Sequence, residues 1–186
     1  MQFYIADTHF GDRDSIGFDH RPFKDCGEME RVLIYLWNDR VDRDDTIWIL
    51  GDFCRNSNVD PVHYLRKLKG KKNLIIGNHD RELLKNERAM SYFETVQDMH
   101  YIQDIYKRET IDVCLCHYPI AEWNGYYQGT WHVFGHIHNQ YNETYKFMKD
   151  RKNCLNAGCM INNYTPSTFR ELVENNTLYL SRIAKL

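Results

Sequence analysis

The chain has 186 residues, with 24 Lys and Arg against 26 Asp and Glu, and so carries a formal net charge of −2. This near balance gives no general attraction to nucleic acid or to an anionic membrane, which argues against a non-specific DNA-binding protein. With 42% hydrophobic residues, ten Gly and four Pro, the composition is globular rather than collagenous or low in complexity. At this length we expect one domain over residues 1–186, without a cap domain.

The N-terminal residues and the cysteines indicate the cellular compartment of the protein. Residues 1–7 have no basic residue, and their apolar run meets a carboxylate too early for a secretory signal. The longest uncharged, apolar-leaning stretch, residues 113–121, is far below the ~20 residues that cross a bilayer. The six cysteines are even in number, but a chain of this size can bury a core unaided, so we expect reduced thiols. Together these features predict a cytoplasmic protein.

Short strand-like segments alternate with helix-like ones, an order typical of an α/β domain. In chain order the sequence predicts a strand at 2–6, a helix at 27–39, a strand at 46–50, a helix at 60–68, a strand at 73–76, a helix at 80–89, strands at 99–106, 110–116, 131–134 and 153–156, a helix at 167–174 and a strand at 177–182. The first helix follows from apolar residues at the i, i+3, i+4, i+7 spacing. Lys107-Arg108-Glu109 is predicted to be a hairpin tip.

Five short motifs each come directly after a predicted strand. They are Asp7-Thr8-His9, Gly51-Asp52, Gly77-Asn78-His79-Asp80, Cys116-His117 and Gly135-His136-Ile137-His138. Each supplies a carboxylate, an amide oxygen or an imidazole, which are ligands suited to first-row divalent metal ions. A lone Gly-Asp or Asp-x-His is usually an ordinary turn, but a chance Gly-Asn-His-Asp in a chain of this length is on the order of one in a thousand. The set therefore indicates a metal site.

In this order the motifs resemble the core pattern of the calcineurin-like metallophosphoesterase superfamily, D-x-H, GD, GNH(D/E), H and GHxH, over residues 7–138. Flanking residues further resemble a group of small uncharacterised bacterial and phage phosphoesterases. These are Arg21-Pro22-Phe23, Cys116-His117-Tyr118-Pro119, Trp123-Asn124-Gly125, Asn162, Tyr164 and Pro166. The resemblance implies a four-layer α/β/β/α sandwich of two mixed sheets flanked by helices. It also implies a site for two divalent metal ions.

The resemblance carries over to the metal ligands residue by residue. One metal ion would be held by Asp7, His9 and His138, and the other by Asn78, His117 and His136, with Asp52 bridging both. Alternate residues of an extended segment point the same way, so His136 and His138 can face one cavity. A bridging carboxylate offsets part of the repulsion between two dications that lie roughly 3.5–4 Å apart. Imidazole and oxygen ligands accept manganese, iron or zinc, so all three remain candidates.

Such a site activates a metal-bound water to attack phosphorus, so phosphoester hydrolysis is the predicted reaction. By the resemblance, His79 is the general acid that protonates the departing alkoxide, and His79 and Asp52 are the predicted catalytic residues. Asn78 is also a candidate for contact with the substrate phosphate. Asp80 would either orient the His79 ring or cap the helix that follows, and its position directly before Arg81-Glu82-Leu83-Leu84 favours the cap.

Two arginines are candidates for substrate binding. In the protein-phosphatase branch of the superfamily, the bridging aspartate is followed three residues later by an aspartate that supports the acid histidine. Here that place is taken by Arg55, which makes protein phosphatase activity less expected. Arg55 and Arg21 would contact a substrate phosphate through a bidentate guanidinium fork, with an ordinary solvated arginine as the alternative.

Three further features admit two interpretations. Arg66, Lys67, Lys69, Lys71 and Lys72 form a basic run that either tracks a nucleic-acid backbone or, more commonly for such runs, is a solvated helix end. Trp123, Tyr126, Tyr127 and Trp131 either stack a nucleobase or pack their own loop. Cys114 and Cys116 share one strand with no second pair at zinc spacing, so buried thiols are expected rather than a zinc site.

These observations favour a hydrolase of small phosphomonoesters or phosphodiesters. A metal-dependent nuclease is the alternative, favoured if the basic run at residues 66–72 borders the metal site. A metal-binding scaffold without catalysis is a third hypothesis, disfavoured because His79 and all the predicted ligands are present. The expected partner is a small phosphoester substrate; nucleic acid is not favoured, and no membrane is expected.

Overall fold

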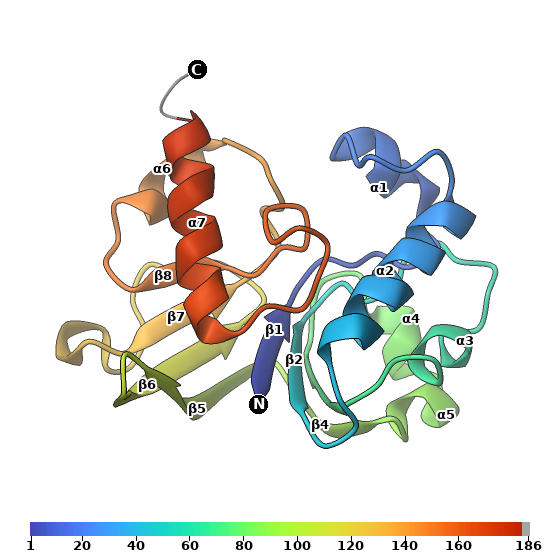
Figure 1. The fold of residues 1–186 in the computed structure, drawn as a ribbon, viewed down its shortest axis with the longest axis horizontal. Coiled ribbons are helices and arrows are strands. Elements are labelled where there is room, and N and C mark those ends of the chain that lie inside the picture. Colours follow the sequence, from blue (N-terminus) through green and yellow to red (C-terminus); the bar gives the residue numbers. More distant parts are fainter. Residues whose placement is uncertain (184–186) are drawn as a thin grey trace.

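The computed structural model describes residues 1–183 and contains two four-stranded sheets flanked by helices (Figure 1). The first sheet has the order β1-β2-β3-β4, formed by Gln2–Ile5, Thr46–Leu50, Lys71–Ile75 and Phe93–Gln97. The second has the order β5-β6-β7-β8, formed by Met99–Tyr106, Glu109–Cys116, Trp131–Phe134 and Cys154–Asn156. The predicted α/β sandwich is confirmed. The first sheet, however, is wholly parallel rather than mixed; only the second is mixed, with β5 and β6 antiparallel.

The first sheet is apolar on both faces, as expected of parallel strands covered on both sides. In β1, Phe3 and Ile5 pack into the core cluster shared with the helices, whereas Tyr4 packs into the cluster shared with the second sheet. Strand β2 repeats the pattern, with Ile47 and Ile49 on the helical side and Trp48 on the other. The period of two therefore builds two cores, one on each side of the same strands.

The helices beside the first sheet are α1 (Arg13–Phe18), α2 (Cys26–Arg40), α3 (Val62–Leu65), α4 (Arg81–Leu84) and α5 (Glu87–Met90). The predicted helix at 27–39 is confirmed as α2, which Asp25 caps by accepting the Glu28 N–H. The predicted helix at 80–89 is broken in two because Asn86 caps α5 by accepting the Ala89 N–H. Helix α1, strand β4 and the helix at Glu143–Lys149 were not predicted.

The second sheet packs against α6 (Glu143–Lys149) and α7 (Phe169–Ile183). The prediction of a strand at 177–182 is wrong, because these residues continue α7. The apolar alternation of Leu178 and Leu180 suggested a strand, but burial of Phe169, Leu172 and Asn176 follows the helical period. Asn176 then joins the helix to the sheet, since its amide accepts the Asn156 N–H and donates to the Asn156 carbonyl.

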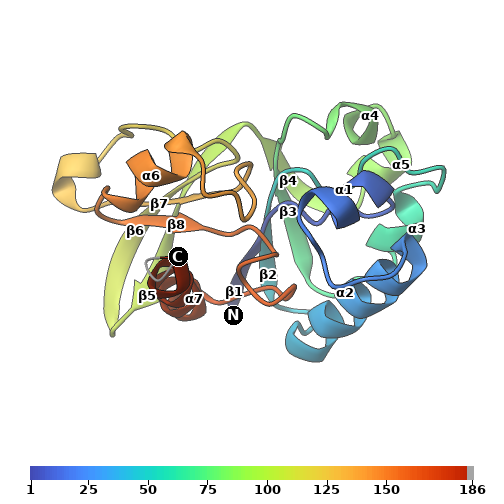
Figure 2. The same ribbon diagram turned by 90° about the horizontal axis from the view of Figure 1, so that it is seen from above.

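The two sheets meet along β1. After β8 the chain runs beside β1, where the Ala6 N–H donates to the Ala157 carbonyl and the Cys159 N–H donates to the Ala6 carbonyl (Figure 2). The end of β6 approaches the end of β2, because His117 Nδ1 lies 2.7 Å from the Leu50 carbonyl oxygen. The carboxyl ends of strands from both sheets therefore converge on one region.

Two smaller predictions, on the hairpin turn and on the cysteines, are also confirmed. Lys107 and Arg108 form the β5–β6 turn, both with positive φ. All six cysteines are free thiols, and Cys114 and Cys116 are buried. Within residues 1–183, no helix combines the length and the apolar character needed to cross a membrane.

Candidate metal centre

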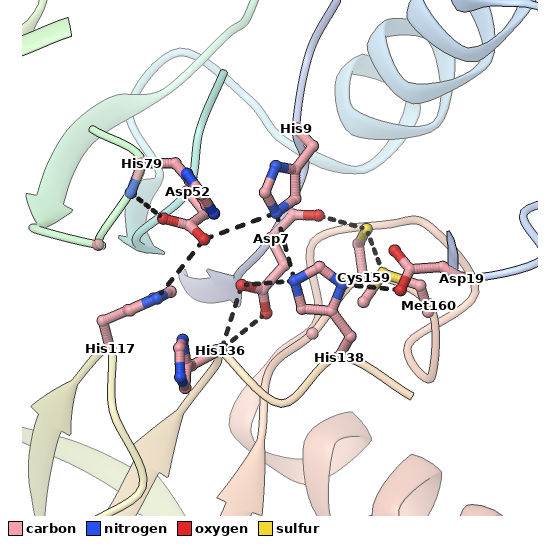
Figure 3. A network of polar contacts seen from close by, with 12 residues as sticks. Asp7, His9, Asp19, Asp52, His79, His117, His136, His138, Cys159 and Met160 are labelled. Atoms are coloured by element: carbon pink, nitrogen blue, oxygen red, sulfur yellow. Dashed lines mark hydrogen bonds and ion pairs between the residues drawn. The ribbon is translucent and has the colours of Figure 1, made fainter. Parts of the chain in front are cut away.

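The five motifs meet where the strands of the two sheets end (Figure 3). The loop after β1 carries Asp7 and His9, the loop after β2 carries Asp52, the loop after β3 carries Asn78, the end of β6 leads to His117, and the loop after β7 carries His136 and His138. The structure thus brings together all seven residues that were predicted as ligands, from positions up to 131 residues apart in the sequence.

The backbone at these loops is strained. Positive φ angles occur at Asp7 (56°), His9 (49°), Asp52 (55°), His136 (69°) and His138 (52°). Residues with a Cβ adopt this left-handed region rarely, and such conformations persist only where surrounding structure imposes them, often at functional sites. Most of the predicted ligands therefore sit on sharp turns that aim their side chains toward one another.

Two glycines of the motifs allow the loops to approach closely. Gly51 has φ +81°, and a Cβ there would meet the His117 ring and lie 2.7 Å from the Gly77 Cα. A Cβ at Gly77 would collide with the backbone and carboxylate of Asp52. The glycines of Gly51-Asp52 and Gly77-Asn78-His79 are therefore required by backbone packing beside the ligands.

A first group of potential ligands comprises Asp7, His9, Asp52 and His138, whose ligand atoms all lie within 4.8 Å of one another. His9 Nε2 is 3.3 Å from His138 Nε2 and 3.6 Å from Asp52 Oδ2. His138 Nε2 is 3.7 Å from Asp7 Oδ1. These side chains are almost wholly buried, so the group is enclosed.

A second group lies on the other side of Asp52. Asn78 Oδ1 is 3.1 Å from His117 Nε2 and 2.9 Å from His136 Nδ1. Asp52 Oδ2, the atom that faces His9, also lies 3.7 Å from His117 Nε2. Because one carboxylate oxygen faces both groups, Asp52 occupies the place that a bridging ligand requires. His136 is exposed, so this second group is more open than the first.

The hydrogen-bond partners of two histidines show that the donor set fits metal ions. His138 Nδ1 lies 2.8 Å from Asp19 Oδ1, and His117 Nδ1 lies 2.7 Å from the Leu50 carbonyl. Because these oxygens accept, each Nδ1 of a neutral ring is assigned the proton and each Nε2 keeps a lone pair. Those lone pairs face further acceptor oxygens of Asp7, Asp52 and Asn78. Lone pairs of nitrogen and oxygen atoms that point at one another cannot pair by hydrogen bonds, but a cation between them would bind both.

Burial dominates the electrostatics of the cluster. It raises the pKa of Asp7 and lowers the pKa of His9 well below its ordinary value, where the charge of His138 adds to the effect. Burial also lowers the pKa of His79, against the opposing charge of Asp52. Burial lowers the pKa of His138 too, but the hydrogen bond with Asp19 and the charge of Asp7 outweigh it, so the net shift is upward. Without a cation, the histidines of this cluster are therefore unevenly disposed to take up protons.

Arg21 does not occupy the place predicted for a substrate contact. Its side chain has no exposed surface, and its guanidinium donates to Asp19 Oδ2 from Nε and Nη2. Nη1 donates to the Thr8 carbonyl and Nη2 also donates to the Asp7 carbonyl, each at 2.9 Å. Arg21 therefore positions the Asp7–His9 loop and Asp19, which in turn orients His138. Asp19 lies 119 positions from His138 and belongs to no motif, so sequence reasoning had no signal for it.

Asp12 lies beside the Nδ1 atom of His9, as Asp19 lies beside the Nδ1 atom of His138. Its Oδ2 lies 3.5 Å from His9 Nδ1 and 3.6 Å from Arg55 Nη1. Both Asp12 Oδ2 and His9 Nδ1 are buried without a hydrogen-bond partner, although they are only slightly too far apart to pair. Asp12 Oδ1 accepts the Asp14 N–H at the start of α1. Arg55, unlike Arg21, is partly exposed and remains a predicted substrate contact.

The expectation that Asp80 caps the following helix is wrong. Its side chain makes no cap hydrogen bond to α4. Instead Asp80 Oδ2 accepts the N–H groups of Asp52 and Gly77, and Oδ1 accepts the Phe53 N–H. Burial raises the pKa of Asp80 to about 6, while these N–H groups oppose the shift. Asp80 therefore ties the loop that carries Asp52 to the loop that carries Asn78.

A cavity of about 390 Å³ opens onto the cluster. Its lining includes His9, Asp52, Asn78, His79, His136 and His138, together with Phe18, Arg55 and Gln140. A larger cavity of about 650 Å³ lies beside α7 and is lined by none of the predicted ligands. The smaller cavity is the candidate reaction site, because every titratable group of the cluster that has any exposure faces it.

The basic run does not border this cavity. Lys67 Nζ is 2.7 Å from Glu30 Oε1, and Lys69 Nζ donates to the Asn38 carbonyl. Lys71 begins β3, whereas the Asn78 loop follows the opposite end of that strand. Likewise Trp123 is buried and donates to the Thr130 carbonyl, and no member of the aromatic group at 123–131 lines the cavity. The sequence feature that would have favoured a nuclease is therefore absent from the rim.

No family model matches the chain. It is 28% identical over 174 residues to an uncharacterized protein of Methanocaldococcus jannaschii, a match that covers 92% of this chain and 89% of that protein. It is 34% identical over 87 residues to the Gene 66 protein of Mycobacterium phage D29, covering 42% of this chain and 39% of that protein. These relatives establish similarity without an assigned activity.

Among solved structures, a protein of unknown function from Aquifex aeolicus matches with a TM-score of 0.67 and 28% identity, covering 94% of this chain and 98% of that one. A nuclease, MPE, from Pseudomonas putida aligns with a TM-score of 0.46 and 18% identity, covering 74% of this chain and 60% of that one. The first likeness extends over nearly the whole architecture. The second is too slight to carry an argument about activity.

Proposed function

We propose that the protein is a metal-dependent phosphoesterase of the calcineurin-like metallophosphoesterase superfamily. In this proposal it hydrolyses small phosphomonoesters or phosphodiesters and binds two divalent ions, manganese, iron or zinc. The observation that carries the proposal is the position of Asp52 Oδ2, 3.6 Å from His9 Nε2 in one ligand group and 3.7 Å from His117 Nε2 in the other. We further propose that residues 1–186 act as one domain, in the cytoplasm.

The chain supplies distinct groups for each part of this reaction. Asp7, His9 and His138 would hold one ion, Asn78, His117 and His136 the other, and Asp52 would join the two. When bound, such a pair of ions supplies an activated water and neutralises charge on the phosphoryl oxygens. Asn78 also lines the open cavity, so its amide is placed to contact the phosphate.

In this proposal His79 is the general acid. Its backbone N–H donates to Asp52 Oδ1 at 2.8 Å, which fixes the residue beside the bridging carboxylate. Its ring lines the cavity, with its centroid 5.6 Å from that of His9. Among the described residues no hydrogen bond engages the ring, so it is free to give its proton to the departing oxygen of a substrate.

The test is a metal titration of stripped protein followed by an assay. We expect two equivalents of Mn²⁺ to bind by calorimetry and elemental analysis, and hydrolysis of p-nitrophenyl phosphate or bis(p-nitrophenyl) phosphate to rise with loading. A folded protein that takes at most one equivalent, or that takes two and hydrolyses neither ester with any of the three metals, contradicts the proposal. The latter result would favour the scaffold hypothesis.

A metal-dependent nuclease is supported equally by the ligand cluster, because nucleases of this chemistry break the same phosphorus–oxygen bond. The two alternatives differ in the size of the substrate rather than in the reacting groups. The basic run at 66–72 lies at the far end of β3. If the protein is a nuclease, other residues near the cavity must therefore bind the nucleic acid.

A further inference from the structure

Two cavities meet at His79. The first is the cavity of about 390 Å³ that opens onto the ligand cluster. The second, of about 400 Å³, lies between the segment after β2 and the start of α4. Both are lined by Arg55, Asn78 and His79, so the proposed acid stands at their common wall. Arg55, Asn78 and His79 therefore border open space on two sides.

The charges of the two cavities differ. Beyond the ligands, the first carries the carboxylates of Asp12 and Asp14, and it shares the Arg55 guanidinium with the second. The second carries the guanidinium groups of Arg55 and Arg81, with Glu82 as its acidic member. Glu82 is engaged by Lys85 at 2.7 Å, whereas Arg81 is exposed and has no carboxylate within ion-pair distance among residues 1–183.

Arg55 is also only loosely engaged. Its nearest carboxylate oxygen is Asp12 Oδ2, at 3.6 Å from Nη1, longer than a hydrogen bond. Two guanidinium groups thus line the second cavity without a close partner of their own. Guanidinium forks recognise phosphate by paired hydrogen bonds, so this cavity suits an anionic group such as phosphate.

We propose that the substrate is a phosphodiester whose leaving group carries a second phosphate, bound by Arg81 and Arg55 in the second cavity. This inference rests on the proposed phosphoesterase function and narrows its substrate class. The oxygen of water forms a bond to phosphorus, the bond from phosphorus to the leaving oxygen breaks, and the His79 proton passes to that oxygen. The products are a phosphomonoester and an alcohol that bears the second phosphate. The proton lost by water restores His79.

The position of His79 decides which side holds the leaving group. An acid must reach the oxygen that departs, and His79 forms the wall between the cavities. A leaving group that begins beside His79 therefore extends into the second cavity, toward Arg81. The other ester group stays in the first cavity, where Phe18 offers an aromatic ring that is 64% exposed.

The test compares three substrates with the metal-loaded protein: a thymidine dinucleotide with one internal diester, and the same dinucleotide with a terminal phosphate at its 5′ or its 3′ end. We expect one of the two terminal phosphates to raise kcat/KM about tenfold, the effect of one good charge-assisted contact. Only one is expected to act, because the leaving group carries only one of the two ends. Arg81→Gln should bring the ratio of rates close to one. Arg88→Gln, an exposed arginine of α5 outside both cavities, should preserve it.

Each other outcome is decisive. Equal rates on all three dinucleotides, or a preference that survives Arg81→Gln, overturns the inference. Hydrolysis of p-nitrophenyl phosphate without hydrolysis of any diester also overturns it but leaves the proposed phosphoesterase function standing. Failure on every ester with two metals bound overturns the proposed function itself. Where the preference holds, equal rates on the phosphorylated dinucleotide and on a decathymidylate assign the diester to nucleic acid, and loss of rate on the longer chain assigns it to a small molecule.

Discussion

The two ends of the first sheet offer an instructive comparison. At the carboxyl ends of β1, β2 and β3, the acceptor oxygens of Asp7, Asp52 and Asn78 face the lone pairs of histidines. At the amino end of β3 lies the basic run, in which Lys67 contacts Glu30 and Lys69 donates to the Asn38 carbonyl. Part of this dense charge is therefore already engaged, whereas the candidate site lies where acceptor atoms converge on one another. Unsatisfied polar atoms identify a binding site better than charge density does.

The largest effect is expected at Asp52, whose Oδ2 atom faces both ligand groups. Asp52→Asn should weaken both metal sites and lower kcat/KM at least about a thousandfold, since the lost charge is worth several kcal/mol at 1.36 per decade. Metal content by elemental analysis and turnover on a nitrophenyl ester check this. The matched control, Asp42→Asn, lies at the amino end of the sheet with its side chain 89% exposed and should change neither. Two metals and full turnover in Asp52→Asn would refute the bridging role.

The next largest effect is expected at His79, the proposed general acid, and it distinguishes that role from the role of a metal ligand. His79→Asn should slow an alkyl phosphoester about 10²–10⁴-fold, the usual range for general acid catalysis. A nitrophenyl ester should lose much less, because its anion departs without a proton. Metal content should equal that of the unaltered protein. Equal losses on both esters would indicate a binding role instead, and loss of a metal ion would make His79 a ligand.

A smaller effect on metal affinity is expected at Asp19, which contacts the candidate ligand His138. Asp19→Asn removes the carboxylate that holds His138 Nδ1 at 2.8 Å, and partners of this kind typically alter metal affinity about 10- to 100-fold. We expect calorimetry to show one of two equivalents weakened and the other intact, with circular dichroism unchanged. A uniform weakening of both equivalents would show instead that Asp19 acts only through the general stability of the fold.

The smallest effect is expected for the basic run at the amino end of β3. Replacing Lys67, Lys69 and Lys71 together by Gln should leave kcat/KM on small esters unchanged and lower the free energy of unfolding by no more than about 1 kcal/mol, as for exposed ion pairs. Affinity of the unaltered protein for single-stranded DNA should show no steep dependence on salt. A steep salt dependence that these substitutions abolish would make the basic run functional and favour the nuclease.

The sequence was most informative where local chemistry repeats a known pattern. Strands β2, β5 and β7 were predicted with their observed bounds, because apolar runs and flanking turn residues are local signals. The first half of α7 was predicted as a helix at 167–174, but its second half was predicted as a strand at 177–182. The apolar alternation at 178–180 resembles a strand, and the helical face appears only in the burial of Phe169, Leu172 and Asn176. Strand β4 was missed because Phe93–Gln97 is only half-buried and carries polar residues between its apolar ones.

What the sequence by itself determined is the set of candidate metal ligands and their positions after strands, because each motif is a few adjacent residues with recognisable chemistry. The tertiary structure alone decided what surrounds them. In the structure Arg21 is buried and bonds to Asp19, and Asp80 bonds to the loops that carry Asp52 and Asn78. Asp19 in turn contacts His138. The physical reason is that a carboxylate or guanidinium takes its role from burial and from the partners that face it, and the fold brings those partners from as far as 119 positions away.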